Sequence, residues 1–195
     1  MTDLADEDRA RAELYGLLST LLAAPPSTQT LDACAGITGD PATPIGAGLT
    51  ALAAAAVRTD AKAAEREFNA LFIGLGRGEL LPYASHYLTG NLNDRPLAAL
   101  RKDMNRLRIS RAKDVFEPED NIASVLEMMR GQIVGAYGVP ATLEGQAAFF
   151  DAHLAPWGQR FFADLEKADA AAFYVPVGTL GLAFLEIETR AFAMG

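Results

Sequence analysis

The chain has 195 residues, of which 25 are acidic and 17 are basic, so its formal net charge is −8. Half of the residues are hydrophobic, which is enough to bury one core, and the length fits one domain better than two. This composition excludes a mainly disordered chain, and the single cysteine, Cys34, excludes a disulfide scaffold. The acidic balance argues against a protein that binds nucleic acid through its phosphates, because such proteins need clustered Lys and Arg.

The sequence contains no recognisable export or membrane segment. Residues 1–11 are polar and acidic, whereas a secretory signal needs a basic lead and an apolar core. The longest apolar run, residues 51–57, is far shorter than the roughly 18 residues of a membrane span. We therefore expect a soluble cytoplasmic protein with no membrane span.

Alanine is the commonest residue and β-branched residues are sparse, which favours helices over strands. Leucines at helical spacing predict a helix over residues 4–23, ended by two prolines, and glycines and prolines break residues 27–48 into short helical pieces. A helix capped by Thr59 or Asp60 should end at Gly74, before a loop that reaches Pro82.

The rest of the chain has further helix starts at capping residues or prolines. They are Asn93 or Asp94, Pro118 (with an inward stripe of Ile122, Val125, Leu126, Met129, Ile133 and Tyr137), Thr142, Pro156 and Asp169. The sequence thus predicts one all-α domain over residues 1–195 with about seven to nine helices. We expect the loop at 74–82 and the connector at 109–116 to be mobile or hinge segments.

Most catalytic arrangements lack support in the sequence. His86 and His153 are far apart and have no local ligand partner, so no metal site is expected. Ser85 and His86 are adjacent and point apart, which argues against a nucleophilic dyad. The glycines of residues 74–78 (GLGRG) follow a helix and lack the Gly-Lys-Ser/Thr ending of a phosphate loop, so we interpret Gly74 as a helix terminator. A nucleotide-hydrolysing enzyme that uses this loop is a remote alternative.

The acids Glu117, Glu119 and Asp120 around Pro118 allow two interpretations. Acids in the first turn of a helix complement its dipole by about 0.3–1 kcal/mol each. Alternatively, with Asn121 they form the polar mouth of an apolar face, which suits a ligand with a basic head and an apolar body. Four aromatic residues near the glycine loop support the second interpretation, although Phe68 is expected in the core. They are Phe68, Phe72, Tyr83 and Tyr87.

Three blocks together resemble the twin-arginine redox-enzyme maturation chaperones of the TorD, DmsD and NarJ type. They are EFNALF (67–72) followed by LPYASHY (81–87), EPEDNI (117–122) followed by LEMM (126–129), and FFDAHLAPW (149–157). The family patterns are E-[FY]-x-x-L-F with P-[WY]-x-S-x-Y, E-P-x-D-H-[IL], and F-x-x-H-L-x-P-W. Asn121 stands where the family usually has His, so a role that depends on titration near neutral pH is in doubt there.

The resemblance implies a non-enzymatic cytoplasmic chaperone. Such a protein binds the twin-arginine leader, the apo form of a molybdenum-cofactor oxidoreductase, or both, assists cofactor insertion and holds back export until maturation. No permanently bound cofactor is expected; transient molybdenum cofactor or guanine nucleotide binding is a family expectation with no residue assigned. Chains of this family can form homodimers by helix exchange, and the sequence leaves the oligomeric state open; nucleic acid is not expected as a partner.

The resemblance and the residue types together predict a peptide-binding site. The expected apolar wall is Leu71, Phe72, Pro82, Tyr83, Ser85 and Tyr87. The expected polar mouth is Glu117, Pro118, Asp120, Asn121 and Glu127. Asp120 and Tyr83 are the central pair, and we expect Asp120→Ala to weaken leader binding without unfolding the protein.

His153, Pro156 and Trp157 are expected to form a scaffold corner between helices. Within the family, the alternative function is an assembly chaperone for a membrane-bound nitrate-reductase-type enzyme, which grips the apoenzyme. A plain helical interaction module without preference for twin arginines is a further alternative.

Overall fold

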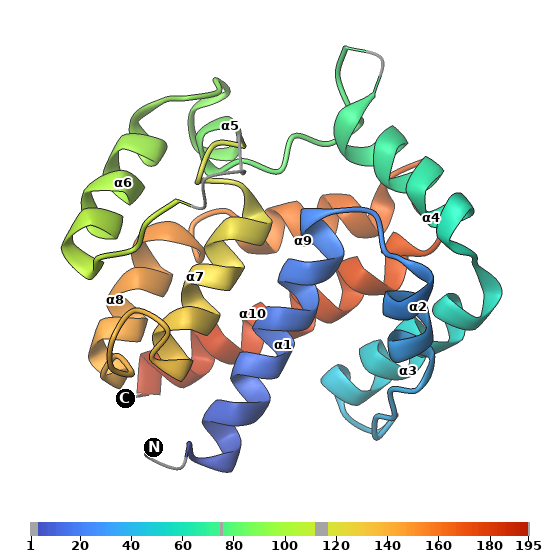
Figure 1. The fold of residues 1–195 in the computed structure, drawn as a ribbon, viewed down its shortest axis with the longest axis horizontal. Helices are drawn as coiled ribbons and strands as arrows, with labels where there is room; N and C mark the ends of the chain where they lie inside the picture. Colours follow the sequence, from blue (N-terminus) through green and yellow to red (C-terminus); the bar gives the residue numbers. More distant parts are fainter. Residues whose placement is uncertain (1–3, 75, 112–116, 195) are drawn as a thin grey trace. The chain divides into compact units, whose positions relative to one another are not determined.

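The computed structural model describes residues 4–74, 76–111 and 117–194, and helices dominate this part of the chain (Figure 1). In chain order they are α1 (Asp6–Ala23), α2 (Thr28–Ala35), α3 (Pro44–Arg58), α4 (Ala61–Phe68), a π-helical turn (Asn69–Ile73), α5 (Ala84–Thr89), α6 (Arg95–Leu107), α7 (Ile122–Val134), α8 (Leu143–His153), α9 (Gly158–Lys167) and α10 (Tyr174–Met194). The predicted all-α class is confirmed. The described residues form ten α-helices, slightly more than expected, because α5 is too short to show a helical period in the sequence.

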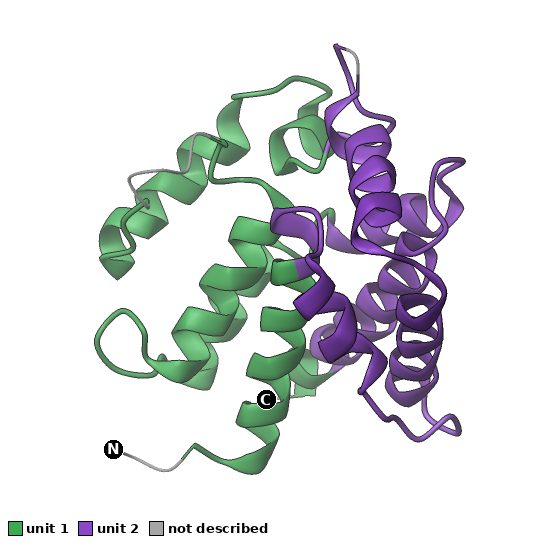
Figure 2. Cartoon of the chain, turned by 45° about the vertical axis from the view of Figure 1, so that its right-hand side comes forward, with its two compact units in different colours: residues 1–20, 82–157, 191–195 green, residues 21–81, 158–190 purple. Residues whose placement is uncertain are grey.

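The chain divides into two compact units, each built from segments that are far apart in the sequence (Figure 2). Unit 1 contains residues 1–20, 82–157 and 191–195, and unit 2 contains residues 21–81 and 158–190. The single domain expected over the whole chain stays a prediction. None of the described helices combines the length and the apolar character that a membrane crossing requires.

Several helix caps lie where the sequence predicts them. The carboxylate of Asp60 accepts from the amide of Ala63 (2.7 Å) at the start of α4. Asp94 caps α6 and Thr142 caps α8 in the same way. Gly74 ends the π-helical turn with a φ of +62°, a conformation that favours glycine. Local capping chemistry therefore fixes these boundaries.

The predicted start of α7 at Pro118 is wrong. The helix begins at Ile122, and Asn121 is its N-cap because the Asn121 side chain accepts from the amide of Ala123 (2.9 Å). It ends at Val134, so its inward stripe stops before Tyr137, the last position expected on it. The other members of the stripe are buried as predicted: Ile122, Val125, Leu126, Met129 and Ile133.

Two later helices also begin after their predicted starts. Helix α9 begins at Gly158 rather than Pro156, and α10 begins at Tyr174 rather than Asp169. In both cases a turn precedes the helix, and the amides in these turns donate to backbone carbonyls of the turn or to side chains rather than within the helix. The connector expected at 109–116 is described only for 109–111, and the rest of it lies outside the described residues.

In unit 1, α1 lies beside α7, and α5 and α6 form an adjacent pair, as do α7 and α8 (Figure 1). The hydroxyl of Ser19 on α1 donates to the carbonyl of Ala123 on α7 (2.8 Å). A Cβ at Gly16 would lie 2.9 Å from the side chain of Arg130, so the glycine permits this close approach. The Ser19 bond holds α1 against the first turn of α7, directly after the acidic motif, and the Gly16 contact holds it further along the helix.

In unit 2, the carboxylate of Glu67 caps the start of α10. It accepts from the amides of Ala172 (2.7 Å), Phe173 (3.0 Å) and Tyr174 (2.8 Å). These amides have no partner inside the helix, so a carboxylate there satisfies them and interacts favourably with the helix dipole. The first residue of the EFNALF block is therefore structural.

We predict that Glu67→Ala lowers the free energy of unfolding by about 2 kcal/mol, because charge-assisted hydrogen bonds to three amides are lost. Urea unfolding at neutral pH measures this change. Glu65→Ala on the same helix is the control, because Glu65 is exposed. An equal effect of the two substitutions would contradict the capping role.

Candidate functional site

The backbone joins the two motif blocks that flank α6. The amide of Ala84 donates to the carbonyl of Asp120 (2.9 Å), and the amide of Ile122 donates to the carbonyl of Pro82 (2.8 Å). These two bonds form an isolated antiparallel bridge in unit 1. The bridge fixes the start of α5 against the start of α7, so residues from both blocks meet at one place.

Asp120 is buried at this bridge, with 1% of its surface exposed. Its Oδ2 accepts from the amide of Ser85 (2.8 Å) in the first turn of α5. Its Oδ1 is also buried and has no hydrogen-bond partner among the residues that the structure describes. A buried acceptor without a partner is energetically unfavourable by about 1–3 kcal/mol, so this oxygen is ready to receive a donor.

Ser85 links α5 to the start of α6. Its hydroxyl accepts from the amide of Asp94 (3.2 Å), and its carbonyl accepts from the hydroxyl of Thr89 (2.8 Å). Its side chain is completely buried. Ser85 therefore organises the wall of the site from inside rather than lining the surface.

Tyr83 and Glu117 form a second contact between the two motif blocks. The hydroxyl of Tyr83 donates to a carboxylate oxygen of Glu117. Partial burial, together with this bond to an anionic acceptor, raises the pKa of Tyr83 far above its ordinary value, so its hydroxyl stays protonated and remains a donor. Tyr83, a candidate for the apolar wall, thus contacts Glu117 of the polar mouth.

Glu119 forms an ion pair within the fold. Its Oε2 accepts from Nε (3.0 Å) and Nη2 (2.7 Å) of Arg101, and Arg111 lies 3.9 Å from its other oxygen. Burial alone would raise the pKa of Glu119, but the hydrogen bonds and charge of Arg101 hold that pKa below its ordinary value. The interpretation of the acids as first-turn dipole partners is wrong, because all three precede the start of α7.

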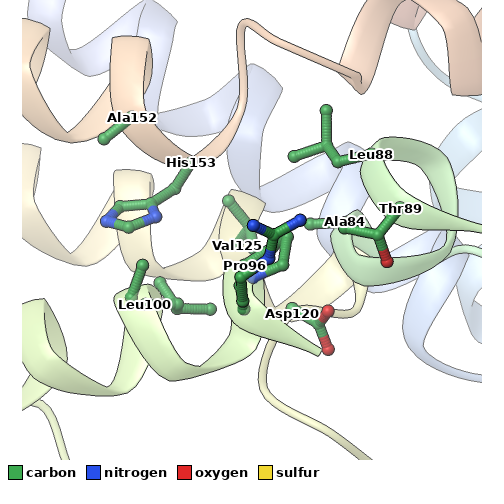
Figure 3. Close-up of a pocket in the computed structure, with 11 residues that line it drawn as sticks. Ala84, Leu88, Thr89, Pro96, Leu100, Asp120, Val125, Ala152 and His153 are labelled. Carbon is green, nitrogen blue, oxygen red and sulfur yellow. The ribbon is translucent and has the colours of Figure 1, made fainter. Parts of the chain in front are cut away.

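A pocket of about 350 Å³ lies in unit 1 between α5, α6, the start of α7 and the end of α8 (Figure 3). Its lining is mainly apolar, with few polar groups. The lining residues are Ala84, Leu88, Thr89, Arg95, Pro96, Ala99, Leu100, Asp120, Val125, Ala152 and His153. Of the site residues predicted from the sequence, this set includes Asp120.

Figure 3 shows the Asp120 carboxylate and the His153 ring at two sides of this pocket, with Val125 and Pro96 between them. The Nε2 of His153 lies 2.8 Å from a carboxylate oxygen of Asp103 on α6. The buried carboxylate of Asp120 is therefore an acceptor of the pocket without a full set of partners. An apolar cavity with one such acceptor suits a ligand that carries a hydrogen-bond donor on an apolar stem.

The third motif block is a scaffold corner, as expected. The indole N–H of Trp157 donates to the carbonyl of His153 (2.8 Å), and Trp157 is buried. The ring of Tyr87 packs on Trp157 with a centroid distance of 5.5 Å. Tyr87 therefore supports α5 through this corner, and His153 belongs both to the corner and to the pocket lining.

Three other predicted site residues are not among the lining residues of this pocket. Leu71 and Phe72 belong to unit 2, where Leu71 is buried and the ring of Phe72 packs against Tyr174 (5.6 Å). Glu127 is exposed on α7 and is bonded to Arg130 (2.8 Å). A peptide-binding role for these three residues stays a prediction. Phe68 is buried, as the sequence predicts.

The sequence reasoning did not identify the contribution of α5 and α6 to the pocket. Leu88 and Thr89 follow the predicted motif directly, and Arg95 and Pro96 occupy the first turn of α6. The 11 residues between Pro82 and the Asp94 cap leave room for one short helix. This spacing is the sequence signal that could have placed the end of α5 and the start of α6 beside one another. Leu88 is 42% exposed, which is unusual for a leucine that lines a pocket.

The glycine loop packs against the end of its own helix. The amides of Glu79 and Leu80 donate to the carbonyls of Ala70 (3.1 Å) and Leu71 (2.8 Å). A Cβ at Gly78 would lie 2.6 Å from the Leu71 carbonyl oxygen. The glycines therefore permit a tight helix exit, which confirms Gly74 as a terminator.

Comparisons with known proteins agree with the family resemblance of the motif blocks. The chain belongs to the nitrate reductase delta subunit family, whose model matches residues 39–163. It is 28% identical to the chaperone protein TorD of Aliivibrio fischeri over 99% of both chains, and 29% identical to the chaperone protein TorD of Photobacterium profundum over 95% of this chain and 94% of that relative. The resemblance found in the three motif blocks is confirmed.

The fold also matches a solved structure. The chain is similar in fold to a protein described as a redox enzyme maturation protein from Archaeoglobus fulgidus, with a TM-score of 0.63. The match covers 90% of this chain and 93% of that chain. At 20% sequence identity this match shows the fold alone. The curated relatives are named as chaperones rather than enzymes, in agreement with the non-enzymatic class expected from the motifs.

The lowered pKa of Glu119 gives a testable pH dependence. Stability from its ionised form is present above the ordinary carboxyl pKa of 4.5 and is lost as the pH falls through the lower folded-state value. We predict that Glu119→Gln destabilises the protein by about 1 kcal/mol at pH 7 and that the difference from wild type shrinks in acid. Urea unfolding across this pH range measures both. The same acid dependence in an Arg101→Gln background would contradict the assigned ion pair.

Proposed function

We propose that this protein is a cytoplasmic maturation chaperone that binds the twin-arginine leader of a molybdenum-cofactor oxidoreductase precursor. It holds the precursor until the cofactor has been inserted and thereby delays export. Membership of the nitrate reductase delta subunit family and full-length similarity to proteins named TorD support this role. The three motif blocks support it independently of overall similarity.

The observation that carries the proposal is the unpartnered Oδ1 of Asp120 beside an apolar pocket. An arginine side chain matches this arrangement, since its apolar stem can lie along Leu88 and Val125 while its guanidinium donates to the carboxylate. The guanidinium presents its donors in a planar fork and is more weakly hydrated than an ammonium group. The pocket should therefore prefer arginine to lysine.

Arg95 lines the same pocket. A second cation there is repelled by Arg95, which lowers the affinity for a bound arginine. A chaperone must release its precursor for export, so moderate affinity suits the task. The single carboxylate then gives selectivity, and most of the affinity comes from elsewhere in the leader.

The apolar segment of the leader has exposed apolar residues to contact beside the pocket. Leu88 is 42% exposed and Leu92 is 45% exposed, and both lie between the bridge and α6. Burying a leucine-sized side chain contributes about 1.5–3 kcal/mol before ordering costs, and micromolar binding needs about 8 kcal/mol net. A few such contacts are sufficient.

We predict that Asp120→Asn weakens binding of a twin-arginine leader peptide about tenfold or more, because hydrogen bonds to charged groups contribute about 1.5–3 kcal/mol. The amide oxygen can keep the bond to the Ser85 amide, while the NH₂ group replaces the acceptor in the pocket by a donor. The variant should also lose the preference for arginine over lysine. Calorimetric titration with both peptides measures this.

Asp151→Asn on α8 is the matched control, because Asp151 is exposed and does not line the pocket. Unchanged leader binding by Asp120→Asn, with wild-type melting behaviour, would contradict the proposal. Asp120→Ala is a poorer test than the sequence suggests. It leaves the buried amide of Ser85 without its acceptor, so we expect a lower melting temperature as well as weaker binding.

The description of the matching family, nitrate reductase delta subunit, favours a second candidate function. In that alternative the protein grips the mature part of an apoenzyme that is assembled at a membrane. Binding measured separately to a leader peptide and to the leaderless apoenzyme distinguishes the two. Homodimer formation and transient binding of molybdenum cofactor or guanine nucleotide stay predictions with no residue assigned.

A further inference from the structure

One segment of this acidic protein, residues 95–111, is rich in basic residues. Residues 95–111 contain six basic side chains and one acid, a formal charge of +5, which leaves −13 on the rest of the chain. All of these residues lie in unit 1, on α6 and the segment that follows it. The sign of this local charge is opposite to that of the net charge of the whole molecule.

Three of the cations form a line on the outer face of α6. Arg95, Lys102 and Arg106 are spaced seven and four residues apart, which places them on one side of an α-helix at axial intervals of about 10.5 and 6 Å. The opposite side of the helix is buried, through Leu97, Leu100 and Met104. We call Arg95, Lys102 and Arg106 the α6 stripe.

The fold neutralises part of this charge through Asp103 and Glu119, and the second carboxylate oxygen of Glu119 lies 3.9 Å from Arg111. Asp103, the acid of the segment, contacts His153 (2.8 Å) and the Nε of Arg106 (3.1 Å). Arg101, on the flank of the helix, is bound to Glu119. Within the described part of the chain, Arg95 and Lys102 make no ion pair. Ala98 and Ala99 are exposed beside the stripe and are too small to cover it.

We propose that the α6 stripe is a docking surface for an acidic segment of a partner polypeptide. This surface shares Arg95 with the lining of the proposed leader pocket. It differs from the leader site in the ligand that it would bind, because the arginine-containing part of a leader carries the same charge as the stripe. In an extended chain, which rises about 3.3 Å per residue, acids three and then two residues apart match the spacing of the stripe. The partner is thus a polypeptide with several acids in one short stretch.

Two features favour an acidic polypeptide over an anionic membrane. Helix α6 has no exposed large apolar side chain, so it offers nothing to insert into a bilayer. The stripe is also narrow, because its three cations lie on one side of a single helix. A single acidic chain matches such a line of charges better than a flat anionic surface does.

The test uses a fluorescein-labelled peptide of Glu and Ala in which the Glu residues are alternately three and two residues apart, titrated with the full-length protein at low salt. The variant is the double substitution Lys102→Glu with Arg106→Glu. The matched control is Lys62→Glu with Arg66→Glu, an exposed pair with the same spacing and the same change in charge on α4 of unit 2. Circular dichroism verifies that both variants fold.

We expect the wild type and the control to bind the peptide equally and the α6 variant to bind about tenfold or more weakly. Binding should fall at higher salt, and a Gln-Ala peptide should not bind. Equal loss in both double variants, or no binding by the wild type, would overturn the proposal. So would anionic vesicles or single-stranded DNA binding as tightly as the peptide with the same dependence on α6, or a self-dimer abolished by the α6 variant.

Discussion

The carboxylate of Asp120 is the interaction on which the rest of the site depends. One of its oxygens bonds the first turn of α5, and its backbone carbonyl forms half of the bridge that joins α5 to α7. Because the residue is buried, its other oxygen is held in place without a partner. The same residue therefore builds the pocket and supplies the acceptor that a ligand can use. Binding of a donor there removes an existing energetic penalty, which makes the carboxylate more selective than an exposed acid would be.

Local rules predicted much of the fold. The caps at Asp60, Asp94 and Thr142 and the terminator Gly74 are short-range features, because each involves a side chain and an amide within a few residues, or one backbone conformation. The buried stripe of α7 follows from periodicity alone. The motif blocks also predicted that Tyr83 and the acidic segment belong together, and the bridge between Tyr83 and Asn121 places them there.

Long-range contacts explain what the sequence could not show. Nothing local distinguishes the three neighbouring acids, yet Glu117 bonds Tyr83, Glu119 pairs with Arg101 and Asp120 is buried. Their different roles depend on partners that tertiary structure brings from α5 and α6. A long-range contact also explains why α7 begins later than predicted. Pro118 is typical of a helix start, but the residues after it form the bridge with Tyr83 instead of a helical turn.

The account proposes two surfaces in unit 1, an apolar pocket with a buried carboxylate for a basic leader and a basic stripe for an acidic segment. Its central claim is that the arginines of the leader enter the pocket beside Asp120. The most direct measurement is photo-crosslinking with a leader peptide that carries a benzophenone residue next to its twin arginines, followed by mass spectrometry. The account predicts adducts on the pocket residues of α5 and α6, above all Leu88 and Pro96. Adducts confined to residues 21–81 and 158–190, with α5 and α6 unmodified, would contradict it.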